Sequence, residues 1–176
     1  MVDTLLVNLY GGPGTGKSTT MHGLIYELRK RGILAEMAPE FAKEAVWEGR
    51  THLLENQLYL FAKQAKVLYD LAGKVDVIVT DAPILNSLLY NEAATPAFEA
   101  LVLEVMNEYA NQLNVILRRV KPYETRGRVN TEAHARLLDA RIASLVWQHC
   151  DADSVIVLDA DETTVGKVIF EVDNLT

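Results

Sequence analysis

Eight residues near the start of the chain constrain its fold more than any other feature. They read Gly-Gly-Pro-Gly-Thr-Gly-Lys-Ser over 11–18, between an apolar run at 5–10 and a helical pattern. Glycines here let successive backbone N–H groups turn inward around an anion, and the N-terminus of the following helix adds partial positive charge. The spacing G-x-x-x-x-G-K-S between a strand and a helix is that of the phosphate-binding P-loop. We therefore expect a nucleotide phosphate site at this position.

The residues of the loop have separate expected roles. Lys17 is expected to reach the β- and γ-phosphates as a point charge, and the hydroxyl of Ser18 to hold Mg²⁺. ATP and Mg²⁺ are therefore the predicted cofactors. The residues expected to bind the nucleotide are Gly12, Pro13, Gly14, Thr15, Gly16, Lys17, Ser18 and Thr19.

Length, charge and cysteine content narrow the class of protein. A chain of 176 residues is expected to form one domain, 1–176, with a substantial core. A net charge of −7 disfavours a broad nucleic-acid surface, and the single cysteine, Cys150, fits a reducing compartment. No run approaches the ~18–20 apolar residues that span a bilayer. We expect a cytoplasmic protein with no membrane partner, as a monomer or a homodimer.

Short apolar runs alternate with helical patterns along the rest of the chain. This alternation predicts an α/β fold in three layers, with a five-stranded parallel sheet between two layers of helices. The expected strands are 5–10, 33–38, 75–80, 115–117 and 154–158. The expected helices begin at Lys17 and end at Gly32, then cover 54–72, 96–111, 131–150 and 163–170.

An aspartate ends the third expected strand. Asp81 follows the apolar residues 77–79 and thus lies at the carboxyl edge of the sheet, where ligands of open α/β sheets bind. A carboxylate in this Walker B position holds Mg²⁺ directly or through water. The alternative is that Asp81 caps a helix that begins near Pro83.

Glu40 ends the second expected strand at the same edge. A carboxylate there can accept the proton of a substrate hydroxyl. Glu40, Glu44 and Glu48 also have the i+4 spacing of a solvated helix face, and the sequence leaves both interpretations open. Gln57 and Gln64 lie on the next helix and are candidates for hydrogen bonds to a nucleobase, with exposed helix glutamines as the alternative.

A basic segment follows the fourth expected strand. Residues 118–128 contain five cations and one acid in an otherwise acidic chain. A hinged arginine loop supplies positive charge during phosphoryl transfer and excludes water. We expect a lid over about 119–130, with Arg128 and Arg126 as catalytic cations and Arg118 as a nucleotide ligand. A solvated charged face is the alternative.

Two other classes of P-loop protein lack support in the sequence. A GTPase carries N-K-x-D and D-x-x-G motifs, and the similar segments 70–73 and 73–76 overlap at a helix end before the third strand. A motor or AAA-type ATPase usually has a glutamate after the Walker B aspartate, where this chain has Ala82. The pattern of a kinase remains.

The order of these features resembles that of the nucleoside and nucleotide kinases. More narrowly, the segments 39–43 and 80–83 and the Tyr-x-x-x-Gly-Arg of 123–128 are similar to the small ATPase/kinase family around ribosylnicotinamide kinase. That family includes phage kinases that act on 5-hydroxymethylpyrimidines in DNA. The resemblance implies sheet order 2-3-1-4-5, ATP as donor, and adenine held between the lid helix and the loop at about 159–163. The lid of that family often reads Asp-Gly-x-Arg, whereas this chain has Arg-Gly-Arg at 126–128.

The sequence thus predicts an ATP- and Mg²⁺-dependent phosphotransferase. Its acceptor is expected to be a hydroxyl of a nucleoside, a nucleotide or a hydroxymethylated pyrimidine, including 5-hydroxymethyluracil in DNA. A phage origin would place it in the host cytoplasm. The competing class is a P-loop NTPase that uses ATP hydrolysis as a conformational switch. The expected catalytic residues are Lys17, Asp81, Glu40, Arg128 and Arg126, the acceptor-binding residues Glu40, Gln57, Gln64 and Asp81, and the metal ligands Ser18 and Asp81.

Overall fold

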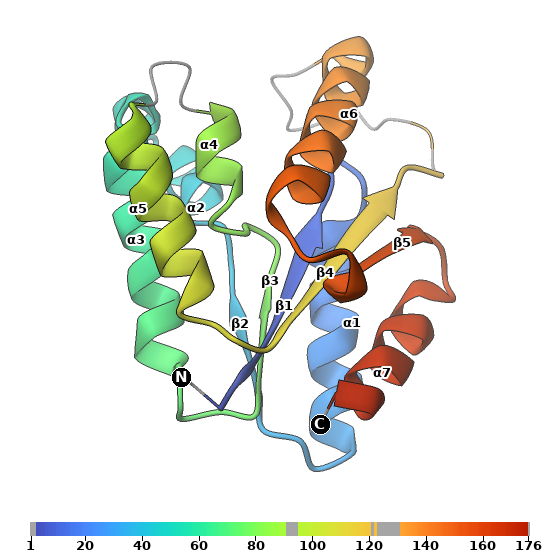
Figure 1. Ribbon diagram of the computed structural model, residues 1–176. Helices are drawn as coiled ribbons and strands as arrows, with labels where there is room; N and C mark the ends of the chain where they lie inside the picture. Colours follow the sequence, from blue (N-terminus) through green and yellow to red (C-terminus); the bar gives the residue numbers. More distant parts are fainter. Residues whose placement is uncertain (1–2, 91–94, 121, 123–130, 176) are drawn as a thin grey trace.

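A five-stranded parallel sheet forms the centre of the molecule (Figure 1). The computed structural model describes residues 3–90, 95–120, 122 and 131–175. The strand order is β2-β3-β1-β4-β5 and every neighbouring pair is parallel, which confirms the predicted fold and sheet order. The strands are β1 (Leu5–Tyr10), β2 (Ala35–Ala38), β3 (Val77–Thr80), β4 (Gln112–Arg118) and β5 (Val155–Asp159).

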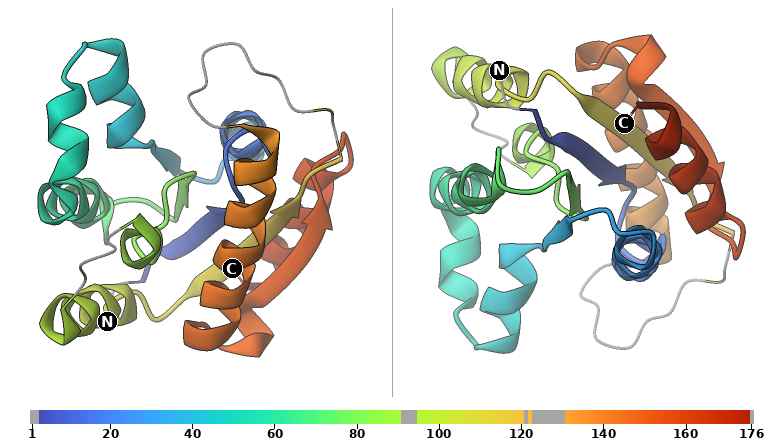
Figure 2. Two further views of the ribbon diagram at one scale, coloured as in Figure 1. Left: turned by 90° about the horizontal axis from the view of Figure 1, so that it is seen from above. Right: turned by 90° about the horizontal axis from the view of Figure 1, so that it is seen from below.

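Helices cover both faces of the sheet, as the views from above and from below show (Figure 2). Side chains that alternate along β1 fill two cores: Val7 and Leu9 pack with α1 and α7, whereas Leu6 packs with α3 and α5. The helices are α1 (Lys17–Lys30), α2 (Phe41–Trp47), α3 (Gln57–Leu71), α4 (Asn86–Tyr90), α5 (Pro96–Asn107), α6 (Glu132–His149) and α7 (Thr164–Leu175). The 3₁₀ turns are η1 (Thr51–Glu55) and η2 (Ala152–Ser154).

The segment after β2 differs from the long helix expected from 54. The chain forms α2, turns at Gly49 with φ of 71°, and passes through η1 before α3 begins. Asn56 caps α3 by accepting a hydrogen bond from the backbone N–H of Tyr59 at 3.0 Å. Glu40 precedes α2 in an extended conformation, so it does not belong to a helix face with Glu44.

Several other strand and helix boundaries differ from the expected ones. β4 begins at Gln112, three residues earlier than expected, because Gln112 and Asn114 are polar residues inside the sheet that hydrogen bond to Asn8. The strand was predicted from a run of apolar residues, and these two polar residues lie before that run. The short helix α4 was not predicted, α5 ends at Asn107 rather than 111, and α7 extends to Leu175.

The carboxyl ends of the strands meet at one edge of the sheet. The P-loop follows β1, Glu40 follows β2 and Asp81 follows β3, while β4 and β5 end at Arg118 and Asp159. Among the helices that the structure describes, none combines the length and apolar character needed to cross a membrane. The fold therefore gathers the predicted site residues where parallel sheets bind ligands.

Candidate functional site

The P-loop connects β1 to α1 through a backbone that only glycine adopts easily. Gly14 and Gly16 have φ of 79° and 102°, in the left-handed region that side chains with a Cβ rarely enter. Thr15 closes the turn by donating its backbone N–H and its hydroxyl to the carbonyl of Gly12, at 3.3 and 3.0 Å. The expected cradle for a phosphate is therefore built into the chain between two regular elements.

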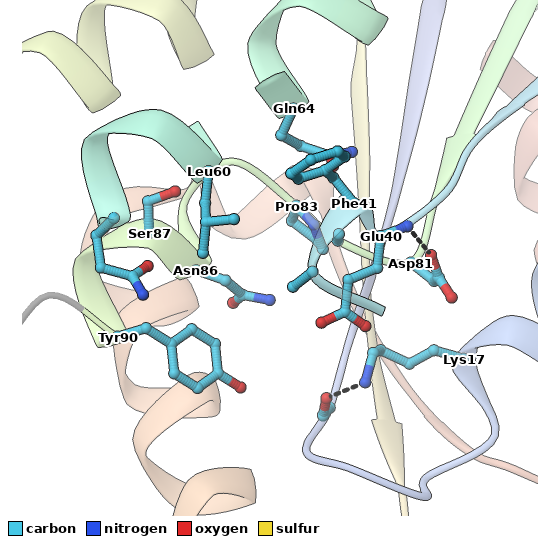
Figure 3. A pocket seen from close by; sticks show the side chains of 14 residues that line it. Lys17, Glu40, Phe41, Leu60, Gln64, Asp81, Pro83, Asn86, Ser87 and Tyr90 are labelled. Carbon is cyan, nitrogen blue, oxygen red and sulfur yellow. Dashed lines mark hydrogen bonds between the residues drawn. The ribbon is translucent and has the colours of Figure 1, made fainter. Parts of the chain in front are cut away.

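Lys17 lies over its own loop. Its Nζ donates to the carbonyl oxygens of Gly11 at 2.6 Å and Gly12 at 3.2 Å, and Figure 3 shows it beside Glu40. Burial lowers the pKa of Lys17, while the negative charges of Glu40 and Asp81 act in the opposite direction. An ammonium held this way is poorly solvated, so it gains strongly from an anionic phosphate nearby.

Ser18 and Asp81 are in direct contact. The Ser18 hydroxyl donates to Oδ2 of Asp81 at 2.5 Å, and Oδ1 of Asp81 accepts the backbone N–H of Glu40 at 3.2 Å. Asp81 is buried, and its carboxylate is occupied by these partners rather than by the N-terminus of α4, which begins at Asn86. The helix-cap alternative for Asp81 is therefore wrong.

The contact between Ser18 and Asp81 suits Mg²⁺. Within the described ranges no three His, Cys, Asp or Glu side chains gather around a point where a metal could bind. Mg²⁺ is usually bound by one or two protein oxygens, with phosphate and water oxygens completing its octahedron. A hydroxyl and a carboxylate beside a P-loop are such a donor set.

A pocket of about 100 Å³ that is open to solvent lies beside Lys17. Figure 3 shows that α2, α3 and α4 contribute its wall, with the carboxylate of Glu40 directed toward Lys17. The four predicted acceptor residues all line it, namely Glu40, Gln57, Gln64 and Asp81. The remainder of the wall was not predicted from the sequence, and it includes Phe41, Leu60, Pro83, Asn86, Ser87 and Tyr90. Only the run 39–43 and the proline after Asp81 gave any signal of it.

Glu40 has the environment of a proton acceptor. Its side chain is exposed at the mouth of the pocket, but protein atoms surround it closely enough for desolvation to raise its pKa. The positive charge of Lys17 lowers that pKa, and the negative charge of Asp81 raises it. A carboxyl with a raised pKa is a stronger base than an ordinary glutamate once it is ionised.

Gln64 is buried, contrary to the alternative of an exposed helix glutamine. Its Nε2 lies 3.4 Å from the carbonyl of Ala38 and 3.3 Å from the hydroxyl of Thr80, which itself donates to Ala38 at 2.7 Å. A carbonyl can only accept, so this relay fixes the NH₂ end inward and leaves Oε1 as the end for a ligand. Gln57, by contrast, donates to the carbonyl of Leu54 at 2.9 Å.

An ion pair between a buried arginine and a partly exposed aspartate supports the P-loop, and it was not predicted from the sequence. The Arg119 side chain is 4% exposed, contacts Asp139 of α6 at 3.1 Å, and donates to the carbonyl of Pro13 at 2.9 Å. Oδ1 of Asp139 also accepts the backbone N–H of Gly12 at 2.7 Å. We call these contacts of Arg119 and Asp139 the P-loop clamp. The expectation that a lid begins at about 119 is corrected accordingly, because Arg119 is fastened to the P-loop.

Arg118 and the loop after β5 lie beside this clamp. Nε of Arg118 pairs with Oδ1 of Asp159 at 2.8 Å, and both side chains are substantially exposed. Thr19 is exposed in the first turn of α1. Arg126 and Arg128 lie outside the described residues, so their roles in a lid stay predictions.

Comparisons with known proteins agree with this architecture. A family model described as "AAA domain" matches residues 6–162. A structure of NadR protein in complex with NR has a TM-score of 0.72 at 19% identity, and covers 99% of this chain and 52% of that one. NadR with NAD and AMP-PNP has a TM-score of 0.68 at 16% identity, covering 99% of this chain and 50% of that one. Deoxyadenosine kinase from M. mycoides with bound dATP has a TM-score of 0.61 at 15% identity, covering 95% and 98% of the two chains.

These structures show the fold, and this chain spans about half the length of the NadR chains. No curated protein sequence matches it significantly. The family match covers most of the chain, and Ala82 lies where motor and AAA-type ATPases usually carry a glutamate after the Walker B aspartate. The predicted resemblance to P-loop nucleoside and nucleotide kinases is confirmed. The chain belongs to the AAA domain family of P-loop proteins, and its fold is that of NadR and of a deoxyadenosine kinase.

Proposed function

We propose that this protein is an ATP- and Mg²⁺-dependent kinase that phosphorylates a hydroxyl group of a nucleoside-like acceptor. The observation that carries the proposal is the pocket of about 100 Å³ beside Lys17, which opens to solvent and has Glu40 and Asp81 in its wall. A P-loop NTPase that works as a conformational switch needs room for one water molecule at this place. A pocket lined by aromatic, aliphatic and amide side chains suits an organic acceptor instead.

The residues around the pocket divide the chemistry between them. Lys17 would stabilise the charge on the γ-phosphoryl group as its bond to the β-phosphate breaks. Glu40, in its carboxylate form, would take the proton of the acceptor hydroxyl as that oxygen bonds to phosphorus. Mg²⁺ held by Ser18 and Asp81 would neutralise charge on the phosphate oxygens. Arg126 and Arg128 would add positive charge from a lid, as the sequence predicts.

The pocket favours a small acceptor over a base within DNA. A base in duplex DNA has to be flipped out before it can enter such a pocket, and the net charge of −7 provides no broad surface for phosphates. Phosphorylation of 5-hydroxymethyluracil in DNA is the narrower form of the proposal that the family resemblance suggested. We also propose that the protein is intracellular and acts as a monomer or a homodimer.

Transfer of labelled γ-phosphate from ATP tests the proposal. The acceptors to compare are nucleosides, nucleotides, nicotinamide riboside and single-stranded oligonucleotides that contain 5-hydroxymethyluracil. A labelled small-molecule product is the expected result, and a labelled oligonucleotide would favour the DNA form. Steady release of inorganic phosphate with every acceptor left unlabelled would contradict the proposal and indicate the switch-type NTPase.

Replacement of Glu40 by glutamine should slow transfer to the acceptor more than it weakens ATP binding. In the wild-type protein the rate should rise with pH as Glu40 loses its proton, and desolvation places this rise above the pH at which an ordinary glutamate ionises. In Glu40→Gln this limb of the profile of kcat against pH should disappear. A variant that keeps both the rate and the limb would exclude Glu40 as the base.

Replacement of Asp81 by asparagine should raise the Mg²⁺ concentration needed for half-maximal activity and lower kcat. The amide can still accept the hydrogen bond from Ser18, but it lacks the negative charge that attracts the cation. Titration of activity with Mg²⁺ at saturating ATP measures both effects. An unchanged Mg²⁺ requirement would remove Asp81 from the metal site.

A further inference from the structure

The carboxamide of Asn86 lies in the pocket wall, and no described residue forms a hydrogen bond with it. Asn86 begins α4 and lines the pocket, and Figure 3 shows its side chain directed across the pocket toward Glu40. Its Oδ1 is buried and has no donor in the part of the chain that the structure describes. The backbone N–H of the same residue is satisfied by the carbonyl of Pro83 at 3.0 Å. The buried group that lacks a partner is therefore the side-chain oxygen.

An unpaired buried amide is unusual and unfavourable. Folding removes such a group from water, and this costs free energy unless a hydrogen bond within the protein replaces those to solvent. Most buried polar atoms in native proteins have a partner, so each exception calls for an explanation. A ligand that enters the pocket and pairs with Asn86 provides one, because the group would then be satisfied in the complex.

The other amides of the pocket each have their NH₂ group bound to the protein. Gln64 donates its NH₂ group to the carbonyl of Ala38 and the hydroxyl of Thr80, and Gln57 donates its NH₂ group to the carbonyl of Leu54. Within the described part of the chain no hydrogen bond occupies either end of the Asn86 carboxamide, and rotation about its side-chain bonds can present either end to a ligand. A carboxamide that offers a donor and an acceptor together is matched by a ligand edge with an acceptor and an N–H side by side.

The surroundings of Asn86 indicate the shape of that ligand. Leu60, Pro83 and Tyr90 line the same region of the pocket, and Figure 3 places Asn86 between Pro83 and Tyr90. Aliphatic and aromatic side chains of this kind contact the faces of a flat ring, while polar groups at its rim fix its orientation. The arrangement suits a planar heterocycle held with its polar edge toward Asn86.

We infer that Asn86 selects the acceptor by pairing with the edge of its planar heterocycle, at an N–H group and an adjacent hydrogen-bond acceptor. This inference rests on the proposed function and specifies its substrate class: ribosides whose base or ring carries an amino or carboxamide group. Asn86 is a specificity residue, because it contacts the ring and takes no part in bond making at phosphorus. Ribosides that lack the N–H should therefore bind poorly.

Calorimetric binding of matched ribosides tests the inference without depending on phosphate transfer. The pairs are adenosine with purine riboside, cytidine with pyrimidin-2-one riboside, and nicotinamide riboside with nicotinate riboside. Wild-type protein should bind the N–H-bearing member of at least one pair about tenfold or more tightly. In Asn86→Leu, which has nearly the same size, this preference should fall to near unity. Asn107→Leu, an exposed asparagine at the end of α5, is the matched control and should keep it.

Thermal unfolding separates selection from a structural role. Leucine removes an unpaired buried amide, so the Tm of Asn86→Leu should equal or exceed that of the wild type. A preference that survives in Asn86→Leu, no preference in the wild type, or no binding of any of the six ribosides would overturn the inference. Binding with the expected preference but without phosphate transfer would support the role of Asn86 and contradict the proposed kinase activity.

Discussion

Replacement of Lys17 by alanine is expected to lower kcat for phosphate transfer by about 10²–10³-fold or more, while the protein stays folded. The charge of Lys17 is held beside the P-loop by the carbonyls of Gly11 and Gly12, where the γ-phosphate is expected to bind. A loss of this size corresponds to roughly 3–4 kcal/mol of transition-state stabilisation. Single-turnover transfer of labelled phosphate measures it directly.

The same substitution should leave stability intact, which separates it from a folding defect. Desolvation lowers the pKa of Lys17, so the folded protein bears a cost for keeping this ammonium charged. Removal of the Lys17 ammonium should therefore leave the Tm unchanged or increase the Tm. Lys30→Ala is a matched control, because Lys30 is an exposed cation in the last turn of the same helix. Transfer within tenfold of the wild type in a folded Lys17→Ala protein would remove the P-loop lysine from the mechanism.

The sequence predicted those parts of the fold and site that depend on local spacing. The P-loop is a contiguous motif, so Lys17 and Ser18 could be assigned before any element was placed. Asp81 and Glu40 were found because parallel strands deliver their last residues to one edge. The sheet order needed the family resemblance, since no strand pattern states which strands are neighbours.

Contacts between segments far apart in the chain were not predicted from the sequence. Arg119 and Asp139 are 20 positions apart, and both look like ordinary surface charges in the sequence. Their burial depends on how α6 packs beside the P-loop, which no local pattern encodes. The pocket wall was missed for the same reason, because Phe41, Asn86 and Tyr90 become neighbours only when α2 and α4 are in place. Gln64 was named, but its burial and fixed orientation follow from the relay through Thr80.

Replacement of Asp139 by alanine is expected to destabilise the protein by about 3–5 kcal/mol, through loss of the P-loop clamp. The Arg119 side chain is 4% exposed, and this change leaves its buried charge without the partly exposed counter-ion Asp139. The backbone N–H of Gly12 loses its acceptor at the same time. A Cβ on Gly12 would lie 2.5 Å from Oδ1 of Asp139 and 2.8 Å from the carbonyl of Ala135, so α6 fits closely against the loop. Nucleotide affinity should therefore fall together with stability.

Denaturant unfolding of the single and double variants distinguishes the clamp from simple loss of packing. Asp139→Asn keeps an acceptor for the backbone N–H of Gly12 but not the negative charge beside Arg119. Its free energy of unfolding should therefore lie between those of the wild type and Asp139→Ala. Arg119→Leu combined with Asp139→Leu removes both charges and should recover much of the stability that Asp139→Ala loses. Nucleotide affinity should stay low in this double variant, because the backbone N–H of Gly12 and the carbonyl of Pro13 then lose their hydrogen bonds to the clamp. Wild-type stability in Asp139→Ala, or wild-type nucleotide affinity in the double variant, would mean that the phosphate cradle is held by the P-loop backbone alone.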